Sequence, residues 1–107
     1  MNSHDQWSSS EKKIARSAFD AALTKIMAEF KMKANAVTEP SQMWEIEDYL
    51  REQRRTLDQM FDYRYSQLIL VFAGLIREGY LDEKLLAGLS QDKREEISRF
   101  LAWHART

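Results

Sequence analysis

Residues 44–79 change abruptly from a charged segment to an apolar one, and they contain no glycine or proline before Gly74. Residues 51–56 are all polar, whereas residues 68–76 are apolar apart from that glycine. A helix that is polar around most of its circumference cannot lie deep in a small protein, while one that is apolar all round is buried. We therefore expect an exposed helical arm followed by the core helix of a compact head.

Helix-start residues place two helices in the arm. Ser8 and Glu11 have the spacing of a capping box, which predicts the start of the first helix. Thr38 is a plausible cap for the second helix, with Pro40 in its first turn, where the missing N–H costs nothing. The polar pattern then continues to about residue 64.

The remaining helix-start and helix-end residues predict the elements of the head. Gly79 is expected at the C′ position that ends the apolar helix. Asp82 caps a short helix of two turns, and Ser90 caps the last helix. The prediction is a single all-α domain, residues 1–107, of four to five helices, with the arm at about residues 8–64 and the head at about residues 65–107.

Apolar residues along the second arm helix recur on alternating three- and four-residue steps, which is the pattern of a heptad seam. Counting the polar Gln53, the members of this seam are Met43, Ile46, Leu50, Gln53, Leu57 and Met60. A chain of 107 residues cannot also bury such a seam within itself. We therefore expect a homodimer formed through the arms, with Leu50, Leu57 and Met60 in the interface.

Charge and composition exclude several classes of partner. The net charge is −1, so the chain lacks the positive field expected for binding nucleic acid or an anionic membrane. The one basic cluster, Arg51, Arg54 and Arg55, has acidic neighbours and no interleaved aromatic residue, so we interpret it as a solvated face or a protein-binding patch. The longest apolar run is too short to span a membrane. Without cysteine, the chain is expected in the cytoplasm.

No motif for a nucleotide, a metal or a catalytic nucleophile is present in the sequence. Four carboxylates do cluster in the arm, but they lie on one helix and alternate with arginines, which is typical of a salt-bridged surface rather than a di-metal site. They are Glu45, Glu47, Asp48 and Glu52. We therefore expect a non-enzymatic protein without a cofactor.

The segments D-Y-L, D-x-x-F-D-x-R-x-S and V-F-A-x-L-I-R-E-G, met in this order within residues 44–79, resemble the fluorescence recovery protein family. The resemblance implies an all-helical homodimer whose long helices pair as arms. It also implies a partner, because members bind the C-terminal, NTF2-like domain of photoactivated orange carotenoid protein. They accelerate the return of that protein to its resting state, and they use no cofactor.

The resemblance also implies site residues. The family's dimer and binding surface corresponds to Trp44, Asp48 and Arg54, with Arg54 available to a carboxylate on a partner. Glu47 stands where the family typically has histidine. It adds a negative charge to the same stretch of helix, and such a change alters which partner surface is complementary.

Two further departures lie on the expected head surface. Leu70 replaces a phenylalanine of the family, and Glu96 replaces a lysine. Two functions therefore stay open. The chain is a recovery protein for an orange carotenoid protein, or it is a homologous helical dimer from a non-photosynthetic bacterium that binds another protein, such as a different NTF2-like domain.

Overall fold

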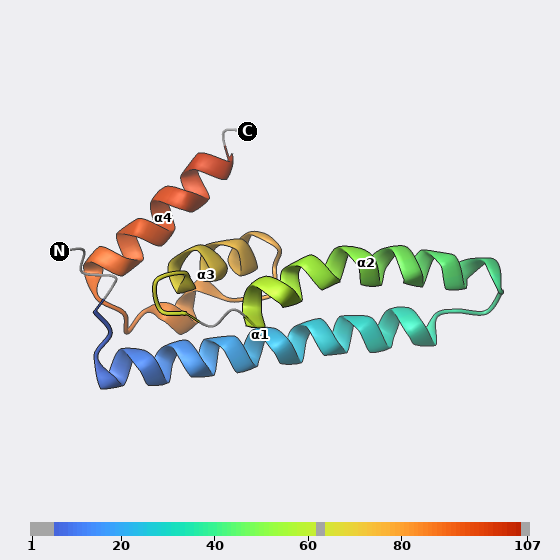
Figure 1. Ribbon diagram of the computed structural model, residues 1–107, viewed down its shortest axis with the longest axis horizontal. Helices are drawn as coiled ribbons and strands as arrows, with labels where there is room; N and C mark the ends of the chain where they lie inside the picture. The colour runs from blue at the N-terminus through green and yellow to red at the C-terminus, as the bar shows by residue number, and fades with distance from the viewer. Residues whose placement is uncertain (1–5, 62–63, 106–107) are drawn as a thin grey trace.

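The computed structural model describes residues 6–61 and 64–105, and every regular element in these two ranges is helical. The elements are α1 (Ser9–Asn35), α2 (Ser41–Phe61), α3 (Leu68–Arg77), the 3-10 helix η2 (Glu83–Leu86) and α4 (Gln91–Ala105). α1 and α2 form an antiparallel hairpin, η2 lies against the N-terminal half of α1, and α3 packs against α4, whose C-terminal end projects outward (Figure 1). The predicted all-α class is confirmed.

The capping box begins α1 as predicted. The Ser8 hydroxyl accepts a hydrogen bond from the Glu11 amide at 3.1 Å, and the Glu11 carboxylate accepts one from the Ser8 amide at 3.1 Å. Two amides that a helix start would otherwise leave unpaired are satisfied in this way.

The N-terminal half of α1 lies in the head. Its buried apolar residues are Ala15, Ala18, Phe19, Ala22 and Ile26. The three alanines leave room for η2 and the turn after it, where a Cβ on Gly88 would lie 2.5 Å from Ile14 Cδ1. In contrast, no side chain in residues 27–59 is buried. We define these residues as the arm from here on, a shorter segment than the predicted arm of about residues 8–64.

The turn between α1 and α2 is closed by Gln42. Its side-chain oxygen accepts hydrogen bonds from the amides of Thr38 and Glu39, at 2.7 and 3.0 Å, and from the Thr38 hydroxyl at 3.2 Å. Pro40 directly precedes α2 instead of lying in its first turn. The predicted cap by Thr38 is therefore wrong: Thr38 donates its hydroxyl to Gln42, and a side chain from inside α2 closes the turn.

α3 is the core helix of the head, as its all-round apolar pattern predicts. Its buried residues are Leu68, Ile69, Phe72, Ala73 and Leu75. Gly79 follows with φ of 84°, the left-handed conformation that glycine adopts most easily. The Tyr80 amide donates to the Leu75 carbonyl at 2.9 Å and the Gly79 amide to the Ile76 carbonyl at 3.0 Å. This pair of bonds is a Schellman motif, so Gly79 has the predicted C′ role.

Two predicted boundaries differ from the structure. α2 ends at Phe61, not at about residue 64. The short helix after Asp82 is a 3-10 helix of four residues instead of two α-helical turns. The Asp82 carboxylate caps it by accepting from the Lys84 amide at 2.9 Å. The capping residue was identified correctly, but the length of the helix was not.

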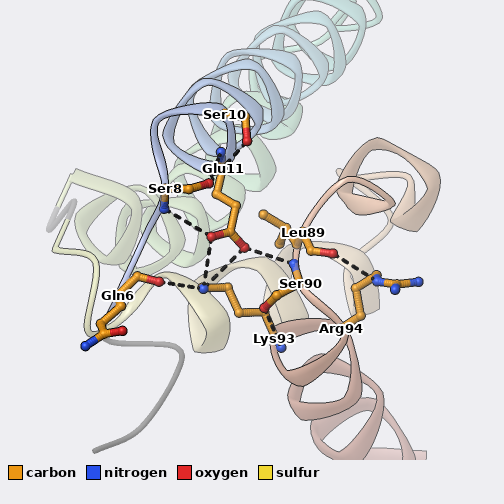
Figure 2. Close-up of polar contacts among 8 residues, drawn as sticks. All are labelled: Gln6, Ser8, Ser10, Glu11, Leu89, Ser90, Lys93 and Arg94. Atoms are coloured by element: carbon orange, nitrogen blue, oxygen red, sulfur yellow. Dashed lines mark hydrogen bonds and ion pairs between the residues drawn. The ribbon is translucent and has the colours of Figure 1, made fainter.

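A buried ion pair fixes the start of α4 to the start of α1 (Figure 2). Lys93 is 1% exposed, and its ammonium lies 3.2 Å from a Glu11 carboxylate oxygen and 2.7 Å from the Gln6 carbonyl to which it donates. The same ammonium lies 4.9 Å from the centre of the Trp7 ring. The Ser90 amide donates to Glu11 at 2.9 Å. We call these five residues the N-terminal clasp.

The clasp determines the protonation state of Glu11. Burial opposes ionisation and by itself raises the pKa of this carboxyl. Hydrogen bonds from the amides of Ser90 and Ser8, together with the ammonium of Lys93, outweigh burial and lower the pKa to about 2. Glu11 is thus a fully ionised and fully paired carboxylate at neutral pH, which is the condition under which a buried charge is tolerated.

Candidate functional site

The side of α2 that faces away from α1 carries most of the candidate residues. Tyr49 contacts α1 through a hydrogen bond to Glu29, and helical periodicity places Glu47, Leu50 and Arg54 on the opposite side. Leu50 is 45% exposed and Trp44 is 66% exposed. We define the outer arm face as Met43, Trp44, Glu47, Leu50, Arg51 and Arg54. Asp48 is exposed at its edge.

The charges of the outer arm face are paired along the helix. Arg51 lies 3.0 Å from Glu47, and Arg54 lies 4.0 Å from Asp58. Both pairs have the four-residue spacing and are exposed, so each stabilises the helix by only about 0.3–0.5 kcal/mol. These arginines can therefore exchange their present carboxylates for those of another protein at little cost.

Met60 is a correction to the predicted seam. It is 1% exposed and belongs to the core, and Leu57 packs partly against the same core. The cause is the mismatch between a seven-residue repeat and 3.6 residues per turn, which moves a seam around a straight helix as the helix proceeds. Met43 and Leu50 consequently face solvent, whereas Met60 at the other end of the seam faces inward.

A shallow surface trough leads from α2 to the head, nearly flat along α2 and deeper beside α3. It consists of three adjoining hollows of about 470, 350 and 310 Å³, of which the first two share Arg55 and Gln59 and the last two share Gln59, Val71 and Gly74. Its basic end contains Arg51, Arg54 and Arg55 on α2. Its apolar end is formed on α3 and α4 by Leu70, Val71 and Phe100. We call it the α2–α3 trough.

The middle of the trough is open because Gly74 lies there. A Cβ added to Gly74 would have no atom within 4 Å, so the absent side chain leaves free space over α3. Leu70, one turn earlier on α3, is 49% exposed at the apolar end. Leu70 is the exposed apolar residue of α3, beside the half-buried Val71 and Ile76.

The structure brings some of the predicted site residues together and leaves others apart. Arg54 and Leu70, sixteen residues apart, line the same trough. Trp44 and Asp48 are exposed farther along the arm. Glu96 does not line the trough; it forms an ion pair with Arg99 on α4.

The sequence reasoning missed several residues that line the trough. Arg55 was already part of the predicted basic cluster, but Gln59 was missed, although it lies one helical turn after Arg55 on α2 and this spacing was available as a signal. Gly74 and Arg77 were not recognisable, because they line the trough only through the packing of α3 beside α2. Their contribution depends on tertiary structure.

Within the described ranges, no three histidine, cysteine or acidic residues are grouped so that they could hold a metal ion. No described helix is both long enough and apolar enough to cross a membrane.

Comparison with known proteins points to one family. Residues 7–101 match the family described as photoprotection regulator fluorescence recovery protein. The fluorescence recovery protein of Synechocystis sp. PCC 6803 is 32% identical over 95 residues, which cover 85% of this chain and 87% of that protein. The solved structure of the fluorescence recovery protein of Fremyella diplosiphon has a TM-score of 0.72 at 32% identity, covering 92% of this chain and 99% of that one. The Synechocystis structure gives a TM-score of 0.70 at 30% identity, covering 95% and 100% of the two chains.

Proposed function

The chain belongs to the fluorescence recovery protein family, and from that premise we propose that it is a homodimeric regulator of an orange carotenoid protein. It binds the C-terminal domain of the photoactivated partner and accelerates its return to the resting state. Its action is binding without catalysis or a cofactor, in the cytoplasm. The observation that carries the proposal is the α2–α3 trough, which joins the outer arm face to the apolar surface around Leu70.

The dimer forms through the outer arm faces of two copies. The arm has no buried side chain of its own, and it exposes Met43, Trp44 and Leu50 on one helix. Apolar residues gathered on one face of a small protein favour association with another surface. In a two-fold dimer the same face serves both subunits, so that the interface is complementary to itself.

The charges of α2 favour an antiparallel dimer. Residues 41–50 carry Glu45, Glu47 and Asp48 and no Lys or Arg, a net charge of −3, whereas residues 51–60 carry three arginines and two acids, a net charge of +1. Antiparallel pairing places the acidic half of one helix against the basic half of the other. With the two-fold axis between residues 50 and 51, Arg54 faces Glu47 of the partner subunit.

The trough receives the carotenoid protein. Its lining contains the cations Arg51, Arg54, Arg55 and Arg77 and the acids Asp58 and Glu78. Four positive and two negative charges give the protomer a net charge of +2 beside an apolar end, and two of the cations, Arg51 and Arg54, lie where the trough meets the outer arm face and so border the dimer interface as well. Such a surface suits a partner with an apolar centre and carboxylates at its rim.

The test is the dark recovery rate of photoactivated orange carotenoid protein with and without this chain at micromolar concentration. We expect acceleration by the wild type. Leu70→Glu places a charge in the apolar end of the trough, so we expect its apparent affinity for the carotenoid protein to fall by about tenfold or more. Leu85→Glu is the matched control, because Leu85 is also 49% exposed but lies on η2 outside the trough. Equal loss of affinity in both variants contradicts the role of the trough.

A second candidate partner is a different NTF2-like protein in a non-photosynthetic bacterium. It is favoured by Glu47 and Glu96, which both add negative charge where the family typically has histidine and lysine. A wild-type chain that is dimeric, and yet leaves the recovery rate of the carotenoid protein unchanged, supports this second candidate.

A further inference from the structure

One carboxylate joins both arm helices to the head. Glu29 Oε1 on α1 accepts hydrogen bonds from the hydroxyl of Tyr49 on α2 and from the hydroxyl of Tyr80 after α3, both at 2.7 Å. Gln53, one turn after Tyr49 on α2, donates its side-chain amide to the Tyr80 hydroxyl at 2.8 Å. We call these four side chains the arm–head network.

The head side of the network is rigid. Tyr80 follows the Schellman glycine, and its own amide is held by the Leu75 carbonyl at 2.9 Å. Lys25, one turn before Glu29 on α1, donates to the Gly79 carbonyl at 3.3 Å. Two side chains on successive turns of α1 therefore contact the same loop, and the Tyr80 side chain is itself buried.

The arm side has little apolar packing. In residues 41–60 of α2, the buried side chain is Met60, which lies at the head end of the helix. Tyr49 and Gln53 are half-buried and lie nearer the middle. Gln53 Oε1 is buried without a hydrogen-bond partner among the described residues. The packing of α2 beside α1 therefore leaves one hydrogen-bond acceptor unsatisfied, which is unfavourable. The position of α2 thus depends on a few polar contacts, of which those to Glu29 are charge-assisted.

The orientation of α2 determines what the outer arm face presents. Tyr49 is adjacent to Leu50 in sequence, and Gln53 is adjacent to Arg54. Since side chains are fixed in direction around a helix, a rotation of α2 that moves Tyr49 away from Glu29 and Gln53 away from Tyr80 also changes where Leu50 and Arg54 point. We propose that Glu29 is the positioning residue that fixes the outer arm face relative to the head. This inference rests on the proposed function of that face.

The ionisation of the network agrees with this assignment. Hydrogen bonds from Tyr49 and Tyr80 lower the pKa of Glu29, so it is a carboxylate at neutral pH. Burial, followed by the hydrogen bond to Glu29, raises the pKa of both tyrosine hydroxyls, which therefore keep their protons and remain donors. Lys33 lies over the Tyr49 ring at 5.0 Å, on the side of the network toward the tip of the arm.

The test is backbone hydrogen exchange of the free, full-length protein, resolved for the arm and for α3. Glu29→Ala removes the shared acceptor, and we expect the amides of residues 42–58 to exchange at least about tenfold faster while those of α3 stay within about twofold. Glu52→Ala is the matched control, because Glu52 is an exposed carboxylate on the arm. We expect it to leave both regions within about twofold of the wild type.

A second variant tests the specific contact. Tyr49→Phe keeps the ring and removes one donor to Glu29, so it should accelerate exchange in the arm less than Glu29→Ala does. Combined with Glu29→Ala, it should add little, because the bond that it removes is already lost. Arm exchange unchanged by Glu29→Ala, or equal acceleration in the arm and α3, overturns the proposal. A wild type that does not accelerate carotenoid-protein recovery contradicts the proposed function only, since exchange is measured without that partner.

Discussion

The arm and the head differ in what holds them together, although both are helical and belong to one short chain. α3 buries five apolar side chains within ten residues, whereas residues 27–59 bury none. The head is joined further by the N-terminal clasp, in which a fully buried lysine meets a carboxylate. The arm instead depends on half-buried polar contacts centred on Glu29.

This difference indicates a division of roles. The head has the apolar burial that stabilises a small domain by itself. The arm leaves Met43, Trp44 and Leu50 exposed together on the outer arm face, where another protein can cover them. We infer that the head supplies most of the stability of the protomer, while the arm supplies most of the surface for association.

The difference in stability between the head and the arm can be tested by removing one apolar side chain from each region. Phe72→Ala empties the centre of the head, where Phe72 has no exposed surface, and should reduce the free energy of unfolding by about 3–5 kcal/mol. Ile46→Ala removes a half-buried side chain from the arm and should reduce it by about 1 kcal/mol. Urea unfolding followed by circular dichroism measures both, and equal losses would contradict the division of roles.

Acidification should reduce the free energy of unfolding, because it protonates Glu11 in the N-terminal clasp. The pKa of Glu11 is about 2 in the folded protein against 4.5 ordinarily, so its contribution is present in full above pH 4.5 and is lost as the pH falls toward 2. The loss should amount to about 3 kcal/mol. Urea unfolding at successive pH values should show a shallower acid dependence for Glu11→Gln than for the wild type. Parallel curves for the two proteins would mean that the clasp is not coupled to folding.

A smaller change, an increase in the free energy of unfolding, is expected at the junction between the two regions. Gly74→Ala should stabilise the protein by about 0.5–1 kcal/mol, because alanine loses less conformational freedom in a helix and the added methyl group meets open space. Thermal unfolding measures this gain. Destabilisation would show that the trough over Gly74 is filled in solution, for example by a second subunit.

Local signals were sufficient to predict several parts of the fold. The Ser8–Glu11 capping box and the glycine at position 79 each depend on residues within one turn, and both have the predicted role. The apolar run of residues 68–76 also predicted the core helix of the head, because burial on all sides leaves little ambiguity. Leu70 is its exposed member: the apolar pattern does not show which face of α3 remains uncovered, and only the family resemblance placed Leu70 on the head surface.

Long-range contacts were beyond the sequence. Lys93 and Glu11 are separated by 82 positions, and Tyr80 and Glu29 by 51, so no periodicity relates them. Glu11 was recognised only as part of a cap, although the same carboxylate also pairs with Lys93. Met60 and Leu50 belong to one seam in sequence, and the drift of that seam around the helix separates them, but only the packing of α2 against the head shows that Met60 is the buried one.

We expect the outer arm face to associate with another copy of the chain. Light scattering coupled to size exclusion tests it most directly, with Leu50→Glu compared with the wild type and with Leu85→Glu. We expect twice the chain mass of 12.7 kDa for the wild type and for Leu85→Glu. For Leu50→Glu we expect the mass of a single chain, with unchanged helicity. A Leu50→Glu protein that remains dimeric would contradict the account.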